Sequence, residues 1–283
     1  MNYYTEIKEQ IINNEITKKI KDYSKNRSDL TTYYNIGKLL SEAGKHYGEG
    51  IIKEYSIKLK NEIYNTTTLK RMRQFYLLIQ KGAPLAHQLS WSNYVEILPI
   101  DDINEVNYYI DISSKLNLTK RELRGRIKSN EYERLDKNTK LKLINKDEPK
   151  VEDLIKNPII IKNNSDYEII SEKILQKLIM EDMEHFLQEL GNQFCFIKSE
   201  YKIRIGNNYN YIDLLLYNIE FNCYIVVELK ITELKKEHIG QIEVYMNYID
   251  NNLKKVNQNK TIGIIICKKI INLLWDIVVI KEY

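Results

Sequence analysis

The stretch YIVVELKIT, from Tyr224 to Thr232, is an apolar run of the kind that fills a β-sheet, and it carries a carboxylate and an ammonium group near its end. Residues two apart in a strand project to the same side of the sheet, so Glu228 and Lys230 share one face. A Val or an Ile at either position would be buried without the desolvation cost that a charge brings. The stretch therefore predicts a buried strand whose two charges need an interaction that offsets this cost.

The segments around this strand predict a mixed sheet flanked by helices. Two apolar runs, 194–205 and 211–217, precede it, and the turn-like breaks GNNYN and NIEFN separate the three segments. Strands joined by such short turns predict an antiparallel meander. A helix over about 233–249 and the apolar run TIGIIIC at 261–267 follow. This order predicts a strand that enters beside the others after a helical crossover.

The pattern of the first half of the chain predicts a set of helices. In NTTTLKRMRQFYLLIQ, residues 65–80, apolar residues recur at the spacing of one helix face, and the threonines before them are candidate N-caps. Thr119 and Glu122 have the spacing of a capping box at the start of a second, short basic helix. Both patterns are typical of helices that begin with a side-chain cap.

The change in the period of the apolar residues predicts where the domains begin and end. Residues 1–135 are predicted to form a mainly α-helical, helix-turn-helix-like domain that binds DNA or a partner. Residues 136–165 hold two of the four prolines among mixed charges, which is typical of a linker. Residues 166–283 are predicted to form a domain of the α/β (α+β) class, which opens with a helix over 167–190 that ends at Gly191.

The composition is that of a globular protein, with 43% hydrophobic and 29% charged residues among 283. The formal net charge of +4 is too small to identify a nucleic-acid partner by itself. The three cysteines are widely spaced beside apolar residues, which is typical of core thiols in a reducing compartment. Because neither a signal-peptide pattern nor a membrane-spanning stretch of roughly 20 apolar residues is found, the sequence predicts a cytoplasmic protein with no membrane partner.

A lone carboxylate in the preceding strand predicts a metal site. Asp213 stands among apolar residues in YIDLLLY, and if the two strands pair, Asp213 and Glu228 converge near the end of the sheet. Two close carboxylates are costly to bury unless a cation lies between them. Mg²⁺, with Mn²⁺ as a substitute, prefers such oxygen ligands. With Lys230 to position a water and neutralise charge on phosphorus, D…ExK predicts phosphodiester hydrolysis.

Each of these residues also has an interpretation without catalysis. Glu228 and Lys230 would be an ion pair of little energetic worth if the strand lay at a sheet edge. Gln241 and Tyr245 lie four residues apart on one face of the predicted helix after the ELK strand. They would either reach a scissile phosphate and orient Lys230, or be ordinary surface polar residues.

Longer segments resemble a known family. The run from Phe186 to Asp250, with IDLLLY, VVELK and GQIEVYMNYID as its most specific parts, resembles the C-terminal nuclease domain of the YhcG-like family within the PD-(D/E)XK superfamily. LSWSNYVEIL and LTKRELRGRIKSNEYERL are similar to the helical N-terminal domain of the same family. The resemblance covers nearly the whole chain.

The resemblance implies a restriction-endonuclease-like fold and a role for each site residue. It implies that Asp213 and Glu228 bind the metal and that Lys230 assists the nucleophile. Gln241 and Tyr245 match the QxxxY element that similar nucleases carry on the helix after the ExK strand. DNA is the implied partner, and association as a homodimer or in a restriction-type or mobile-element complex is implied more loosely.

The chain departs from the family pattern at two places. Ser199-Glu200 stands where relatives tend to have an Arg-Gln pair, so Glu200 is either an extra metal ligand or a plain substitution. After IGIIICKK the family pattern usually continues, whereas here INLLWDIVVIKEY ends the chain, which is compatible with a truncated or frame-shifted C-terminus.

Basic residues on two predicted helices are candidates for DNA contact. Lys70, Arg71 and Arg73 lie near the start of the helix over 65–80 and opposite its apolar face, and Arg121 and Arg124 lie in the second basic helix. A recognition helix in a major groove has this pattern. A solvated helix face in a lysine-rich protein has it too.

Two functions are compatible with these patterns. The first is a Mg²⁺-dependent DNA endonuclease with a helical DNA-binding or partner-binding domain. The alternative is a catalytically inactive accessory protein that binds DNA or a complex. Only the first predicts cleavage that depends on Mg²⁺ or Mn²⁺, whereas the second predicts binding that weakens steeply with salt and no turnover.

Overall fold

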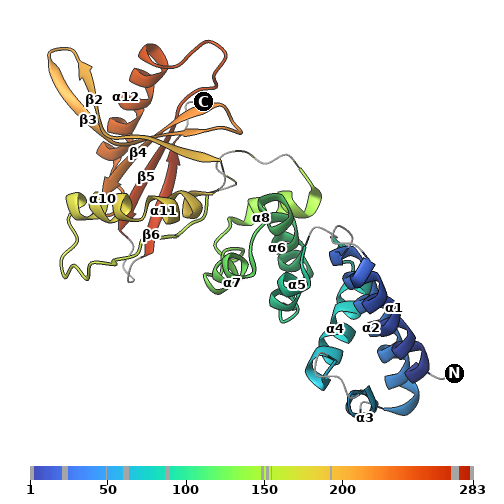
Figure 1. Ribbon diagram of the computed structural model, residues 1–283. Coiled ribbons are helices and arrows are strands. Elements are labelled where there is room, and N and C mark those ends of the chain that lie inside the picture. Colours follow the sequence, from blue (N-terminus) through green and yellow to red (C-terminus); the bar gives the residue numbers. More distant parts are fainter. Residues whose placement is uncertain are drawn as a thin grey trace. The chain divides into compact units, whose positions relative to one another are not determined.

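A computed structural model describes most of the chain, and two compact units, Met1–Tyr132 and Glu133–Tyr283, make it up (Figure 1). The described residues are 3–20, 25–48, 50–59, 64–86, 89–147, 150, 153, 155–191, 193–268 and 274–280. Among them, no helix combines the length and the apolar character that crossing a membrane requires.

The first unit is helical throughout its described elements, as the apolar periodicity predicts. Its helices are α1 (Tyr3–Ile20), α2 (Lys25–Tyr47), α3 (Ile51–Leu59), α4 (Thr66–Gln80), α5 (Trp91–Ile97), α6 (Ile103–Leu116) and α7 (Lys120–Lys128).

Helix α4 has the buried face that its sequence predicts, but a different N-cap. The cap is Asn65, whose side chain accepts a hydrogen bond from the backbone N–H of Thr68 at 3.0 Å, so the expectation of a threonine cap is wrong by one residue. Asn and Thr both cap well, and the first of the four polar residues takes the position. α2 meets α4 at Gly37, where a side-chain carbon would overlap the carbonyl oxygen of Met72.

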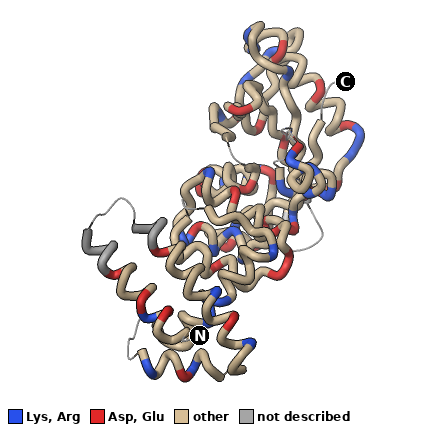
Figure 2. The backbone as a smooth tube through the Cα atoms, turned by 90° about the vertical axis from the view of Figure 1, so that its right-hand side faces the viewer, with Lys and Arg blue, Asp and Glu red and all other residues tan. Residues whose placement is uncertain are grey.

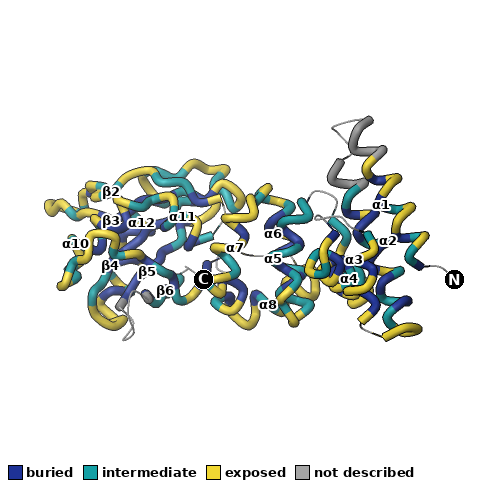
Figure 3. The backbone as a smooth tube through the Cα atoms, turned by 60° about the horizontal axis from the view of Figure 1, so that its bottom comes forward, coloured by how far each residue is buried: buried dark blue, intermediate teal, exposed yellow. Residues whose placement is uncertain are grey.

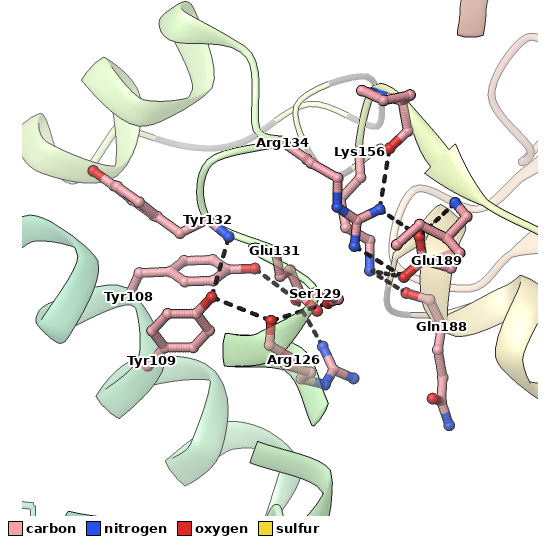
Figure 4. A network of polar contacts seen from close by, with 12 residues as sticks. Tyr108, Tyr109, Arg126, Ser129, Glu131, Tyr132, Arg134, Lys156, Gln188 and Glu189 are labelled. Carbon is pink, nitrogen blue, oxygen red and sulfur yellow. Dashed lines mark hydrogen bonds and ion pairs between the residues drawn. The ribbon is translucent and has the colours of Figure 1, made fainter. Parts of the chain in front are cut away.

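The capping box at the start of α7 is confirmed. The Thr119 hydroxyl accepts from the backbone N–H of Glu122 at 3.3 Å, and the Glu122 carboxylate accepts from the backbone N–H of Thr119 at 2.7 Å. At the other end of α7, the buried Glu131 carboxylate accepts from Tyr108 at 2.8 Å and from Arg126 at 2.9 Å (Figure 4). Both ends of this short helix are therefore fixed by carboxylates.

The second unit begins with folded segments where a linker was expected. Residues 136–165 hold α8 (Lys137–Asn145) and β1 (Ile159–Ile160). Asp136 caps α8 by accepting from the backbone N–H of Asn138 at 2.8 Å. The Asn157 side chain exchanges hydrogen bonds with the backbone of Ile277, 120 residues further on. These contacts give the mixed-charge segment a fixed place in the second unit.

Two helices occupy the segment predicted as one helix over 167–190. They are α10 (Glu172–Glu181) and α11 (Met183–Leu190). Asp182 leaves the helical conformation and caps α11 by accepting from the backbone N–H of His185 at 3.3 Å, which explains the break. The chain leaves α11 at Gly191, as predicted, with a φ of 127° that favours glycine.

A buried ion-pair network fixes α11 within the second unit (Figure 4). The Arg134 guanidinium pairs with both oxygens of Glu189, which is 6% exposed, and also donates to the carbonyl of Pro158 at 3.0 Å. Lys156 adds a second cation 3.6 Å from Glu189. Burial is the largest single effect and raises the pKa of the Glu189 carboxyl, but the two cations and the backbone N–H of Ile160 together lower that pKa overall. This network joins α11 to the segment around Arg134, Lys156 and Pro158.

The sheet has the mixed topology that the sequence predicts. Its strands are β2 (Phe194–Ile205), β3 (Asn208–Asn218), β4 (Cys223–Lys230), β5 (Ile262–Lys268) and β6 (Leu274–Ile280), in addition to β1. Their order is β1-β6-β5-β4-β3-β2, with β4 and β5 parallel and all other neighbours antiparallel. The crossover between β4 and β5 is α12 (Lys236–Asn252). Strand β6, which continues the sheet beyond β5, was not predicted.

Helices cover both faces of this sheet and create two cores. Alternate residues of β4 serve the two cores: Val227 packs with α10 and α11, whereas Val226 packs with α12. Six of the eight β4 residues are buried (Figure 3). A charged residue at the end of β4 is therefore placed in an environment that is apolar on both sides.

Candidate functional site

The site lies where β3 and β4 separate. Their pairing runs from Asn218 opposite Cys223 to Leu214 opposite Val227 and ends there. One residue further, Asp213 points a carboxylate oxygen at β4, where it accepts from the backbone N–H of Leu229 at 2.8 Å. The Asp213 side chain thus accepts a hydrogen bond that a backbone carbonyl would accept in a regular sheet. This bond holds the Asp213 carboxylate beside the charged end of β4.

Glu228 is buried beside this aspartate. It is 2% exposed, and its Oε2 lies 3.2 Å from the Lys230 Nζ. Its other oxygen, Oε1, is buried and has no hydrogen-bond partner among the described residues. Burial in the first place, and the Asp213 charge in the second, raise the pKa of Glu228 to about 7 against the opposing effect of Lys230. As it stands, the site has too much negative charge for its surroundings.

Lys230 supplies the positive charge at this place. Burial alone would lower its pKa, but the carboxylates of Glu228, Glu172 and Asp213 raise the pKa overall. Its side chain is 13% exposed, so the ammonium group retains limited contact with solvent. Lys230 is therefore a protonated cation and not a base in the pH range of the cell.

Helix α12 brings the other two predicted residues to the same region. The Gln241 side chain donates to the Tyr245 hydroxyl at 2.9 Å. Tyr245 is buried, and burial together with the charges of Glu228 and Asp213 raises its pKa, which Gln241 and Lys230 oppose. The structure thus brings Tyr245 within electrostatic reach of the three strand residues, with Gln241 holding its oxygen.

The start of α10 contributes groups that the sequence did not single out. Gln176 donates to the backbone carbonyl of Asp213 at 3.1 Å. The pKa of Asp213 is raised, mainly because the carboxyl group is buried. Glu172, which lies one turn before Gln176 and is exposed, raises it further through its negative charge. The spacing of four residues between Glu172 and Gln176 is visible in the sequence. No sequence pattern, however, predicts that the face of α10 that carries them lies against the end of β3.

Glu200 lies near Asp213 on the neighbouring strand. Its carboxylate is a further, smaller contribution to the raised pKa of Asp213. Its φ of 46° is unusual for a residue other than glycine. Ser199 and Tyr201 pair with Leu214 and Ile212, so Glu200 is opposite Asp213 in the β2–β3 register. The residue that departs from the family pattern therefore borders the site.

The donor set fits a hard divalent cation held by few protein ligands. No group of three or more His, Cys, Asp and Glu suited to a metal ion occurs in the part of the chain that the structure describes. Asp213 and the unpartnered oxygen of Glu228 offer two carboxylates, the number with which Mg²⁺ commonly binds when waters and substrate phosphate complete its shell. A cation there would also offset the charge that raises the pKa of Glu228.

The basic residues of the first unit differ in how free their charges are. Lys70 and Arg71 are exposed on α4, and Arg121 is exposed on α7. Arg73 is half-buried and engaged in an interaction of its own. Lys and Arg are interspersed with Asp and Glu along the chain (Figure 2). Lys70 and Arg71 are therefore the exposed members of the predicted group on α4.

Arg124 is a cation whose charge is already used. Its guanidinium donates twice to Glu96, at 2.8 Å from Nε and from Nη2. Lys120 lies 3.5 Å from the same carboxylate. A bidentate pair of this kind fixes the Arg124 side chain within the protein, so the structure favours a structural role for it over the predicted DNA contact.

A mixed sheet between helices, with two carboxylates and a lysine where β3 and β4 separate, is the arrangement of a PD-(D/E)XK nuclease domain. Two family models match the chain: the YhcG PDDEXK nuclease domain over residues 152–274 and the DUF1016 N-terminal domain over residues 6–134. The chain thus joins a region that matches the YhcG PDDEXK nuclease domain to a region that matches the DUF1016 N-terminal domain.

A curated relative supports this assignment. The Escherichia coli (strain K12) protein named "Putative nuclease YhcG" is 23% identical over 283 aligned residues, which cover 83% of this chain and 76% of the relative. No solved structure matches the chain.

Proposed function

We propose that the protein is a Mg²⁺-dependent DNA endonuclease that hydrolyses phosphodiester bonds at the Asp213, Glu228 and Lys230 site. The strongest support is the position of these three side chains: two strands bring two carboxylates together, and one buried carboxylate oxygen has no hydrogen-bond partner in the described part of the chain. Burying such a group without a compensating contact costs on the order of 1–3 kcal/mol. A metal ligand is the function that best offsets this cost.

The carboxylates of Asp213 and Glu228 would hold the ion. Bound Mg²⁺ supplies Lewis-acid polarisation of a phosphoryl oxygen in sites of this kind. The Leu229 N–H keeps one Asp213 oxygen in place, so the carboxylate needs little reorganisation. Glu228 must be ionised to act as a ligand, and its raised pKa makes that step depend on pH near neutrality.

Lys230 would act on the phosphate. During hydrolysis, a water oxygen loses a proton to solvent and forms a bond to phosphorus, while the bond from phosphorus to the leaving oxygen breaks and that oxygen takes up a proton from solvent. Negative charge accumulates on the phosphoryl oxygens in the transition state. The protonated Lys230 ammonium, 3.2 Å from Glu228, would neutralise part of that charge. Tyr245, with its oxygen held by Gln241, would keep its hydroxyl proton free to orient a phosphate oxygen.

Cleavage by the purified full chain tests this function. We expect nicked or linear product from supercoiled DNA with Mg²⁺ or Mn²⁺ and none with EDTA. Asp213→Asn keeps an oxygen that can accept from Leu229 and should lose cleavage while remaining folded. Unchanged cleavage by Asp213→Asn would show that the activity belongs elsewhere. Salt-dependent DNA binding without cleavage under any of these conditions would support the inactive accessory protein instead.

Assembly remains a separate proposal. A second copy of the protein would supply the active site that cuts the second DNA strand. A restriction-type or mobile-element complex would direct the protein to its DNA target. Light scattering of the purified protein, with and without DNA, tests for the homodimer.

A further inference from the structure

Strands β2 and β3 extend well past the rest of the sheet. The β3–β4 register ends at Leu214, whereas β2 and β3 remain paired down to Ile205 opposite Asn208. Residues 201–212 therefore form a two-stranded ribbon that protrudes from the sheet and turns at Gly206 (Figure 1). Gly206 has a φ of 60°, as a tight hairpin turn requires.

The two faces of the ribbon differ in character. Ile203 and Ile212, at 1% and 0% exposure, pack into the core under α12. The opposite face carries four exposed residues in two cross-strand pairs. We call it the Lys-Tyr face; its members are Lys202 opposite Tyr211 and Arg204 opposite Tyr209. Lys202 and Arg204 are also the sole charged residues of 201–212, so this face is positively charged.

The tyrosines of this face are exposed to an extent that packing does not explain. Tyr209 is 58% exposed and Tyr211 is 53% exposed. The Lys202 ammonium lies 3.8 Å from the centre of the Tyr209 ring, which joins a cation and an aromatic surface in one unit. Exposed aromatic rings beside cations are the composition of a surface that stacks on bases and contacts phosphates.

The Lys-Tyr face precedes the candidate site directly along β3. Tyr209, Tyr211 and Asp213 follow one another at intervals of two residues along β3, and a strand rises about 3.4 Å per residue. Tyr211 is thus about 7 Å along the strand from the proposed metal ligand. A DNA strand with a phosphate at Asp213 has neighbouring nucleotides within reach of these rings.

We propose that the Lys-Tyr face binds unpaired nucleotides of the DNA next to the cleaved phosphate, with Tyr209 and Tyr211 stacking on bases and Lys202 and Arg204 contacting the backbone. This inference rests on the proposed nuclease function and names the form of its substrate. A base in intact duplex is covered on both faces by its neighbours, so tyrosine rings can stack only where bases are unpaired. A ribbon that reads a major groove would instead present side chains that hydrogen-bond to base edges.

Binding without turnover tests the inference. The full-length Asp213→Asn protein is titrated with a fluorescent single strand, a duplex with a single-stranded extension, and a blunt duplex of equal length. We expect Tyr209→Ala with Tyr211→Ala to weaken binding to the first two by at least about 30-fold, and binding to the blunt duplex by less than about 3-fold. Tyr209→Phe with Tyr211→Phe keeps both rings and should bind as tightly as the parent.

A control variant and a charge variant complete the test. Tyr47→Ala removes another tyrosine, 59% exposed and outside the ribbon, and should leave all three affinities unchanged. Lys202→Gln with Arg204→Gln should reduce the slope of log affinity against log salt by about 1.4 on the single strand, or about 0.7 for each contact. An unchanged unfolding midpoint (Tm) in every variant shows that the fold is retained.

The outcomes separate this inference from the proposed function. Equal losses on all three DNAs, or no loss on any, would overturn the stacking face even if the wild-type protein cuts DNA. A loss confined to unpaired DNA would support the face even if the wild-type protein never cuts, in which case the proposed nuclease function alone fails.

Discussion

Glu228 is the residue on which the chemistry of the site depends most. Its carboxyl group is buried, faces Asp213 and has one oxygen without a partner among the described residues. Such a group is poorly placed in a protein without a bound cation, and well placed in one that binds a cation. The difference has a direct thermodynamic consequence.

The pH dependence of stability follows from the raised pKa of Glu228, about 7 in the fold against an ordinary 4.5. Below pH 4.5 both the folded and unfolded chain hold the proton. As pH rises to 7 and above, the folded protein loses up to roughly 3 kcal/mol. Urea unfolding in EDTA should show this loss in the wild type and its absence in Glu228→Gln. If the free energy of unfolding of the two proteins changed with pH in the same way, the raised pKa of Glu228 would be contradicted.

Lys230 is expected to affect catalysis more than folding. Lys230→Ala removes the cation that would neutralise the phosphoryl oxygens, so single-turnover cleavage should fall by about 100- to 1,000-fold. The same change should raise the pKa of Glu228 further, because Lys230 lowers it in the wild type. Quench-flow rates measured from pH 6 to 9 test both effects, and a variant with wild-type rates would exclude Lys230 from the reaction.

The residues of the site were predictable to different degrees. Asp213, Glu228 and Lys230 are charges inside apolar strands, and the cost of burying them is readable from the sequence alone. Glu172 and Gln176 lie on an amphipathic helix that looks ordinary, because their importance comes from where the helix meets β3. The pairing of Arg124 with Glu96 was equally hidden, since the two residues are 28 positions apart.

At the scale of elements, α12 connects the sheet to the site. It packs on β5 at Gly263, where an added side-chain carbon would lie 2.7 Å from the Met246 sulfur and 2.9 Å from the Ile242 Cδ1 atom. The same helix carries Gln241 and Tyr245. The close approach of α12 to the sheet therefore sets the distance of its polar residues from Glu228.

A pair of glycine substitutions tests this arrangement. Gly263→Ala forces flexible side-chain ends to move and should lower the free energy of unfolding by about 1–3 kcal/mol, with a fall in cleavage because α12 shifts. Gly240 lies in α12, and no atom is within 4 Å of the carbon that an alanine would add there. Gly240→Ala should therefore raise the free energy of unfolding by about 0.5–1 kcal/mol. Chemical denaturation measures both, and similar effects of the two substitutions would contradict the packing.

The elements themselves were largely predictable where periodicity or turns are strong. The three-strand meander, the parallel return of β5 and the α7 capping box are confirmed because each follows from short-range rules. The break at Asp182 and the fold of 136–165 were missed, since they depend on side-chain bonds such as the one from Asn157 to the distant Ile277. Strand β6 was missed because pairing with β5, and not its own pattern alone, makes it a strand.

At the scale of the whole molecule, the net charge of +4 says little, because acidic and basic residues are interspersed (Figure 2). What distinguishes the basic residues is whether each cation has a partner. Lys70 and Arg71 are exposed, whereas Arg124 is held by Glu96. Contact with DNA phosphates should follow this difference.

Salt titration of duplex binding measures that difference. Lys70→Gln with Arg71→Gln should reduce the slope of log affinity against log salt by about 1 to 2. The reason is that a protein with fewer phosphate contacts releases fewer counterions from the DNA when it binds. Arg124→Gln should leave the slope unchanged and instead lower Tm, because Glu96 loses its bidentate partner. A slope that changes only with Arg124 would show that the helical unit binds DNA through α7 and not α4.

The central claim is that Asp213 and Glu228 form one metal site, and Mn²⁺ binding followed by electron paramagnetic resonance at pH 8 tests it most directly. We predict that the wild-type protein and Glu220→Gln, which removes an exposed carboxylate in the β3–β4 turn, bind Mn²⁺ with the same affinity. Asp213→Asn and Glu228→Gln should each weaken binding at least about 10-fold. Equal Mn²⁺ affinity in all four proteins would contradict the metal site.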